Sequence, residues 1–150
     1  MTRNASLPTL FGRFSIISGE HQRLSTTLRQ LAEMCLALDA GSQQLGADSD
    51  PRRLLAALQL NLERHFATEE ADDYFGAVAR ERPSLLPSIA NLRAEHTAML
   101  ETTAELGAIS ADEHRWAELC APTLRLLERL RAHEQAESLL LQDFFEPAED

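Results

Sequence analysis

The chain has 150 residues, of which 44% are hydrophobic and only 5% aromatic, and its formal net charge is −10 at pH 7. This length suits one domain with a single sizeable core. The acidity argues against a surface for nucleic acid or for an anionic membrane, because both attract clusters of Lys and Arg.

Two further features bear on location. No run approaches the roughly 18 apolar residues of a membrane span, and the polar start of the chain lacks the apolar segment of a signal peptide. We therefore expect a cytoplasmic protein without a membrane partner. The two cysteines, Cys35 and Cys120, fit neither a disulfide framework nor a zinc cluster, and we interpret them as small buried hydrophobes.

The sequence is interpreted as one domain over residues 1–150. Residues 1–13 show no clear hydrophobic period and are predicted to form an N-terminal arm, which leaves residues 14–145 for a helical bundle. A first helix is expected from about residue 14 to residue 40. Its core face begins at His21, and Gly41 is its expected end.

A second helix is predicted to begin where Asp50 precedes Pro51. An aspartate side chain can cap the first turn, and proline is favoured at the first helical position. The helix is expected to run to about Arg80. It carries His65 and Glu69 on its leucine face, since residues four apart share one side of a helix.

A third helix is predicted from an apolar stripe over residues 85–106 that includes His96. Gly107 is expected to end this helix. Ser110, followed three residues later by Glu113, has the form of a capping box that would open the last helix.

The longest stripe covers residues 116–144 and includes His133 and Glu137 one turn apart. Pro122 lies within it and removes a backbone donor, so we expect it to bend or break the helix. Residues 111–121 are then a candidate for a separate segment.

Four helices of about 20 to 30 residues with short links predict an all-α, up-and-down antiparallel four-helix bundle. At about 1.5 Å per residue, His65 and His96 lie at similar distances from the link between the second and third helices. A break at Pro122 places His133 at the same level. The core-facing polar residues are thus expected in one layer: His21, His65, Glu69, His96, His133 and Glu137.

Imidazoles and carboxylates in an apolar core need partners, because each unpaired polar group costs about 1 to 3 kcal/mol and a charge costs more. A single core histidine is most often structural, but one on each of four helices is typical of a metal site. Imidazole suits zinc, copper, iron and nickel, and carboxylates can bridge two metals. Six ligands exceed the four of tetrahedral zinc. We therefore predict these six residues as ligands of two metal ions, and assign no catalytic residue.

The ferritin-like Glu-x-x-His motif is absent, and both copies here read His-x-x-x-Glu. This arrangement resembles the hemerythrin-like family, also called HHE cation-binding domains, over residues 14–145. The resemblance implies two iron ions joined by an oxo or hydroxo bridge. It places His21 and His65 on one iron and His96 and His133 on the other, with Glu69 and Glu137 bridging them.

The chain departs from the oxygen-carrying hemerythrins at two places. Leu92 and Leu100 stand where a second histidine of the third helix is expected, and Ser138 stands where an aspartate is expected. The chain is more similar to the branch with fewer histidines. That branch includes the di-iron domains of proteins that repair iron–sulfur centres after nitric oxide stress, and iron- or oxygen-responsive domains.

Two functions remain as hypotheses. The first is a non-haem di-iron protein that binds or reacts with dioxygen, nitric oxide or peroxide in sensing, stress defence or iron handling. The alternative is a redox-silent metal-binding bundle that acts as an iron or zinc store or as a protein-interaction module. An enzymatic role of peroxidase or oxidase type stays undecided.

Several neighbouring residues have open roles. Glu20, Glu70, Glu95 and Glu134 either complete the coordination, orient an imidazole or lie on solvated helix faces. The side chains expected to line the pocket are Phe66, Tyr74, Met99 and Leu100. The apolar residues that either cover the mouth of the bundle or form a homodimer contact are Ile16, Ile17, Phe144 and Phe145.

Overall fold

The computed structural model describes residues 3–41 and 50–146, with the side chains of residues 19–41 and 50–146. The helices are α1 (Arg3–Asp39), α2 (Pro51–Glu70), α3 (Phe75–Glu81), α4 (Leu86–Ser110) and α5 (Cys120–Phe145). Two 3-10 segments, η2 (Pro83–Leu85) and η3 (Glu113–Leu119), precede α4 and α5. These residue ranges contain no strand, so the predicted all-α class is confirmed for them.

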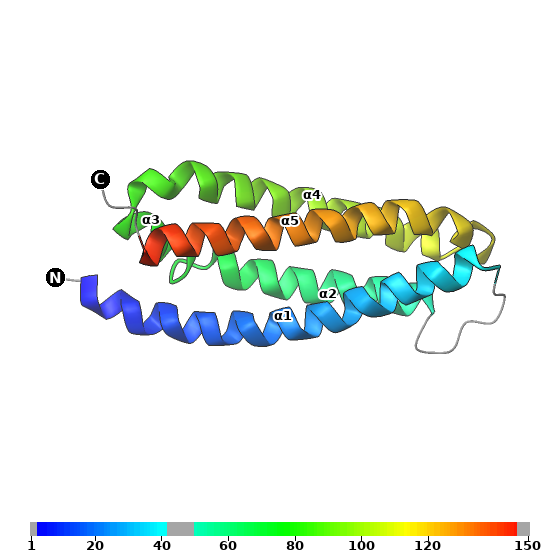
Figure 1. Ribbon diagram of the computed structural model, residues 1–150, viewed down its shortest axis with the longest axis horizontal. Coiled ribbons are helices and arrows are strands. Elements are labelled where there is room, and N and C mark those ends of the chain that lie inside the picture. The colour runs from blue at the N-terminus through cyan, green and yellow to red at the C-terminus, as the bar shows by residue number, and fades with distance from the viewer. Residues whose placement is uncertain (1–2, 42–49, 147–150) are drawn as a thin grey trace.

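The four long helices pack in the ring order α1, α2, α4, α5, and α5 returns to contact α1. Neighbouring helices run in opposite directions, with α3 at one end of the bundle and η3 at the other (Figure 1). This is the predicted bundle of four long antiparallel helices. None of the helices in the described ranges combines the length and the apolar character needed to cross a membrane.

Helix α1 begins at Arg3, so residues 3–13, which were expected to form an arm, are helical. A hydrophobic period indicates which residues pack against a core, whereas a helix is formed by backbone hydrogen bonds. A helix can therefore extend beyond the residues that show the period. The other end matches the prediction. Gly41 has φ 76°, a left-handed conformation that glycine adopts without steric cost, and it follows the last turn of α1.

Helix α2 begins as predicted, because the Asp50 side chain accepts a hydrogen bond from the backbone N–H of Arg52 (2.9 Å). Its predicted end near Arg80 is wrong. The helix stops at Glu70, and the chain turns before α3 begins at Phe75. The turn falls in a stretch with two aspartates and a nearby glycine, all poor helix formers, and it directs Tyr74 into the core.

Helix α4 continues through Gly107, its predicted end, and stops at Ser110. Glycine ends a helix readily when its φ turns positive, and Gly107 keeps a negative φ. The predicted capping box is also wrong, since the Ser110 hydroxyl donates to the carbonyl oxygen of Gly107 (2.6 Å). Asp112 caps η3 instead, by accepting from the backbone N–H of His114 (3.0 Å).

The predicted break near Pro122 is confirmed. Residues 111–121 consist mostly of η3, and α5 begins at Cys120, so Pro122 lies in its first turn, where a missing N–H has no helical acceptor to lose. The indole N–H of Trp116 donates to the carbonyl oxygen of Ser110 (2.8 Å) and ties this connection to α4.

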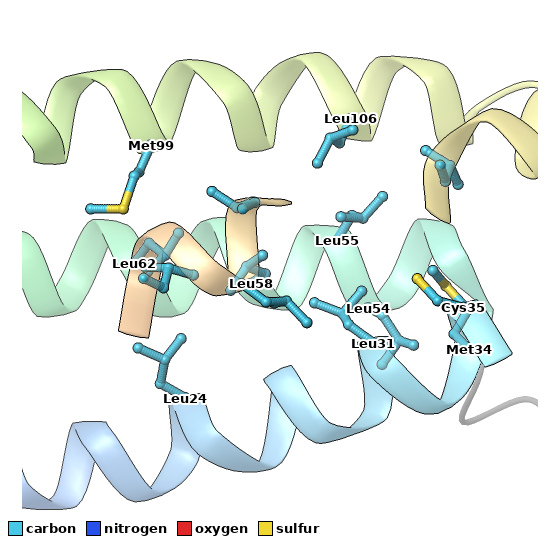
Figure 2. Packing of buried hydrophobic residues seen from close by; sticks show 14 of the residues in the cluster. Leu24, Leu31, Met34, Cys35, Leu54, Leu55, Leu58, Leu62, Met99 and Leu106 are labelled. Carbon is cyan, nitrogen blue, oxygen red and sulfur yellow. The ribbon is translucent and has the colours of Figure 1, made fainter. Parts of the chain in front are cut away.

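Two hydrophobic clusters fill the bundle. The first lies toward η3 and includes Leu62 and Met99 (Figure 2), and it also contains Phe66 and Leu130. The second lies toward α3: Tyr74, Phe75, Val78, Ile89, Leu92, Leu140 and Phe144. Along α4, His96 lies between Leu92 of the second cluster and Met99 of the first. The core is therefore divided by a layer of polar side chains.

Candidate metal centre

All six residues predicted as metal ligands lie together in this polar layer. Helix α1 contributes one, α2 two, α4 one and α5 two. Five of the side chains are no more than 1% exposed: His65, Glu69, His96, His133 and Glu137. His21 is half-buried. The spacing of three and four residues along each helix places these side chains inside the bundle, as expected for positions on the core stripe.

The imidazoles form two close pairs. Nε2 of His21 lies 3.1 Å from Nε2 of His65, and Nε2 of His96 lies 3.1 Å from Nε2 of His133. These are the same pairs that the family resemblance implied. In both pairs the Nε2 atoms face the interior of the layer.

Glu69 reaches both pairs. Its Oε1 lies 3.2 Å from Nε2 of His65, 3.2 Å from Nε2 of His96 and 3.9 Å from Nε2 of His133. Donor atoms gather into two groups of three, each within 4.8 Å: Glu69 with His96 and His133, and Glu137 with His21 and His65. These groups of nitrogen and oxygen donors could hold metal ions.

A second set of carboxylates lies behind the imidazoles. Nδ1 of His96 lies 2.9 Å from Oε2 of Glu70, and Nδ1 of His133 lies 2.6 Å from Oε2 of Glu95. An ionised carboxylate can only accept, so Nδ1 carries the proton in both rings. Nε2 of each ring then remains as the nitrogen that could bind a metal. Glu70 and Glu95, whose roles the sequence left open, thus orient imidazoles.

Glu20 and Glu134, the other two glutamates whose roles the sequence left open, do not hydrogen-bond to an imidazole of the layer. Oε1 of Glu20 lies 3.6 Å from Nδ1 of His65, which is an ion-pair distance but beyond a hydrogen bond. Glu134 acts through its charge: burial raises the pKa of Glu137, Glu69 raises it further, and the charge of Glu134 adds to this effect. Neither geometry gives a donor atom within the two groups of three.

Three carboxylate oxygens of the layer lack a hydrogen-bond partner among the described residues. Both oxygens of Glu69 and Oε2 of Glu137 are buried and accept no well-aligned hydrogen bond from the residues that the structure describes. Burial works to raise the pKa of Glu69, but the imidazoles of His133 and His96 outweigh it and lower that pKa below its usual range. Buried carboxylate oxygens without a well-aligned hydrogen bond are costly unless a cation meets them, so the donor set fits a metal.

Tyr74, which is not one of the predicted ligands, also makes a polar contact to the site. Its hydroxyl donates to Oε1 of Glu137 (2.9 Å), and its side chain is fully buried. Burial and the charge of Glu137 raise the pKa of the phenol. The residue was predicted to line the pocket, but its contact with Glu137 was not predicted, because it depends on the turn between α2 and α3.

Aromatic rings cover the imidazoles. Phe66 stacks on His96 with ring centroids 3.9 Å apart, and Phe75, which the sequence did not single out, lies 5.9 Å from the same ring. Met99 lies beside His133, where it helps to line a cavity of about 150 Å³ together with Glu95, Arg129 and Ala132. Leu100 packs against the first hydrophobic cluster instead.

Comparison of the chain with models of known protein families, with curated proteins and with solved structures finds no match. The residues of the polar layer and their geometry are therefore what indicates a function for this chain.

Proposed function

We propose that this chain is a hemerythrin-like, non-haem di-iron protein that binds or reacts with dioxygen, nitric oxide or peroxide. The observation that carries the proposal is the presence of two imidazole pairs, each with Nε2 atoms 3.1 Å apart, and of a carboxylate, Glu69, that reaches both pairs. Two ions held by a shared carboxylate fit this arrangement better than one.

The donor types support iron. Imidazole and carboxylate donors suit iron as well as zinc, but structural zinc sites are four-coordinate and commonly include thiolates, which this layer lacks among its described residues. Six side chains shared between two ions leave coordination positions for a small molecule. An iron pair bound here would supply a redox-active centre for that molecule.

The surroundings favour a small ligand. The cavity against His133 has a volume of about 150 Å³, whereas pockets for organic ligands are commonly about 300 to 1,000 Å³. The rings of Phe66 and Phe75 stack beside the imidazole of His96, which is 1% exposed. The chain itself therefore contributes a largely buried layer in which the imidazoles of His96 and His133 have fixed orientations.

Metal analysis with an ultraviolet–visible spectrum tests the proposal, on protein purified from medium that contains iron. We expect about two irons per chain and visible bands that bleach on reduction and return in air. One zinc ion or no metal, with a featureless spectrum, would contradict it.

A second experiment tests the shared carboxylate. Glu69→Ala should lose more metal than His21→Ala, because Glu69 reaches both imidazole pairs and His21 belongs to one. The metal content of the two purified variants is compared with that of the wild type. Equal retention in both variants would rule out a shared role for Glu69.

One observation favours the alternative function, a redox-silent metal-binding bundle that stores metal or presents a surface to a partner. Five of the six candidate ligands are no more than 1% exposed, as in a site that fastens helices together. This alternative predicts bound zinc or iron with a spectrum that does not change when oxygen is added.

A further inference from the structure

The two glutamates of the polar layer are not equivalent. Both oxygens of Glu69 are buried without a well-aligned hydrogen bond, whereas Oε1 of Glu137 accepts the Tyr74 hydroxyl at 2.9 Å and only its Oε2 lacks such a bond. Glu69 also lies within 3.2 Å of one imidazole from each pair. Glu137 groups with His21 and His65. The local sequence does not distinguish the two residues, since each follows a histidine by four positions.

We propose that Tyr74 is a positioning residue that restricts Glu137 to the metal of the His21 and His65 pair, so that Glu69 alone is shared between the two pairs. The inference rests on the proposed function, since it concerns the same metal layer. The family resemblance implied that Glu69 and Glu137 bridge the two metals equally. In the proposed arrangement only Glu69 is shared, and the Tyr74 hydroxyl fixes Glu137 at one pair.

The phenol is well placed for this role because it has little freedom to move. Tyr74 is fully buried, and its ring packs against that of Phe75 at 5.2 Å between centroids. The turn that follows α2 brings it to the layer from the α3 end, opposite the larger hydrophobic cluster. A hydroxyl fixed in this way uses one lone pair of Oε1 of Glu137 and limits the rotation of the carboxylate, which sets the direction of Oε2.

The two histidine pairs differ in their carboxylate donors. The pair of His96 and His133 has Glu69 as its carboxylate in the group of three donors, whereas the pair of His21 and His65 has Glu137 and also lies beside Glu69. We therefore expect unequal sites, of which the His96 and His133 site depends on Glu69 and not on Glu137.

Titration of the metal-free protein with Co²⁺ tests this, because the intensity of the visible cobalt bands falls as the coordination number rises. Glu69→Gln should weaken both binding steps by roughly tenfold or more, and Glu137→Gln should weaken only one of them. Tyr74→Phe keeps the ring but frees Oε1 of Glu137, so the band intensity per cobalt should fall at one site. In the Glu137→Gln background, Tyr74→Phe should change nothing further.

Circular dichroism checks that each metal-free variant is folded. Glu137→Gln keeps the side-chain volume, so it tests the inference even if Tyr74→Phe does not fold. Equal weakening of the same steps by Glu69→Gln and Glu137→Gln, or a cobalt spectrum that is identical in Tyr74→Phe and wild type, would overturn the inference while the di-iron proposal stands. A wild-type protein that binds neither Co²⁺ nor iron would overturn both.

Discussion

At the scale of single residues, carboxylates outside the polar layer orient two of its imidazoles. Glu70 and Glu95 hold Nδ1 of His96 and of His133 at 2.9 and 2.6 Å. Both glutamates are at least partly exposed, so their charges remain hydrated while their acceptor oxygens point inward. Such partners fix the tautomer of a ligand histidine and raise its basicity.

Glu70→Gln and Glu95→Gln are therefore expected to weaken metal binding by about 10- to 100-fold, because an amide is a poorer acceptor and no longer supports the imidazole with a charge. Competition with a chelator of known affinity measures the effect. Glu105→Gln, an exposed residue of α4, is the control and should leave affinity unchanged. An equal loss in all three variants would point to net charge as the cause.

Cys35 and Cys120 were predicted to be small buried side chains, and the structure confirms this, since both are buried and free. Sγ of Cys35 lies 3.9 Å from the carbonyl oxygen of Cys120, and Sγ of Cys120 lies 3.5 Å from the carbonyl oxygen of Cys35. Burial raises the pKa of the Cys35 thiol to about 12. The reactive thiolate is therefore scarce at neutral pH.

We expect both thiols to resist alkylation by iodoacetamide at pH 8 in the native protein and to react fully after unfolding. Mass spectrometry before and after denaturation measures the modification. Because the pKa of Cys35 is raised in the folded state, its protection should persist as the pH rises from 8 to 9. Rapid modification of either thiol in the native protein would contradict the burial.

At the scale of elements, the helices differ from the sequence pattern mainly at their ends. Helix α4 passes through Gly107, where a Cβ atom would meet nothing within 4 Å, while the chain leaves α1 through Gly41 with φ 76°. The two glycines therefore have opposite roles. One weakens a helix interior, and the other permits a turn that other residues rarely adopt.

Gly107→Ala should raise the free energy of unfolding by about 0.5 to 1 kcal/mol, because alanine has less freedom in the unfolded chain and fits the helix. Gly41→Ala is the matched comparison and should lower it, since its φ is strained for any residue with a Cβ. Urea unfolding of the metal-free proteins measures both changes. A loss of stability in Gly107→Ala would show that the open space at this position is needed.

At the scale of the whole molecule, the hydrophobic clusters on both sides of the polar layer stabilise the bundle, and the layer contains the donor atoms that could hold metal. Leu126 lies in the first cluster and is 1% exposed, while His96 lies in the layer. A substitution in the cluster should thus affect folding and leave metal binding intact. A substitution in the layer should do the reverse.

Leu126→Ala is expected to cost about 2 to 5 kcal/mol of stability, from lost burial and the cavity that remains. Its folded fraction should keep the wild-type metal content. His96→Ala should lose metal, and the metal-free protein should lose less stability than Leu126→Ala does. Chemical unfolding with metal analysis of the folded fraction separates the two effects, and loss of metal in folded Leu126→Ala would couple the cluster to the site.

Metal should also stabilise the whole bundle, because an ion that binds only the folded state adds free energy by mass action. An excess of about 100 times the dissociation constant adds roughly 2.7 kcal/mol for one site. The melting temperature of the wild type should therefore rise with metal concentration. His96→Ala should show a smaller rise, and an unchanged melting temperature in the wild type would contradict metal binding in the layer.

Sequence alone determined which side chains share a face, because helix periodicity is local: residues three and four apart lie together whatever the helix packs against. That was enough for the all-α bundle, for the cap at Asp50, for the break before Pro122 and for the set of six polar core residues. The metal, its chemistry and the family remain proposals.

Only the tertiary structure decided what lies opposite those faces. The passage of α4 through Gly107 depends on packing, which overrides a weak local propensity. The same holds for the contact of Tyr74 with Glu137 and for the placement of Glu70 and Glu95 behind the imidazoles, since each joins residues far apart in the chain. Periodicity places a residue on a helix, but distances between helices are set by how all of them pack together.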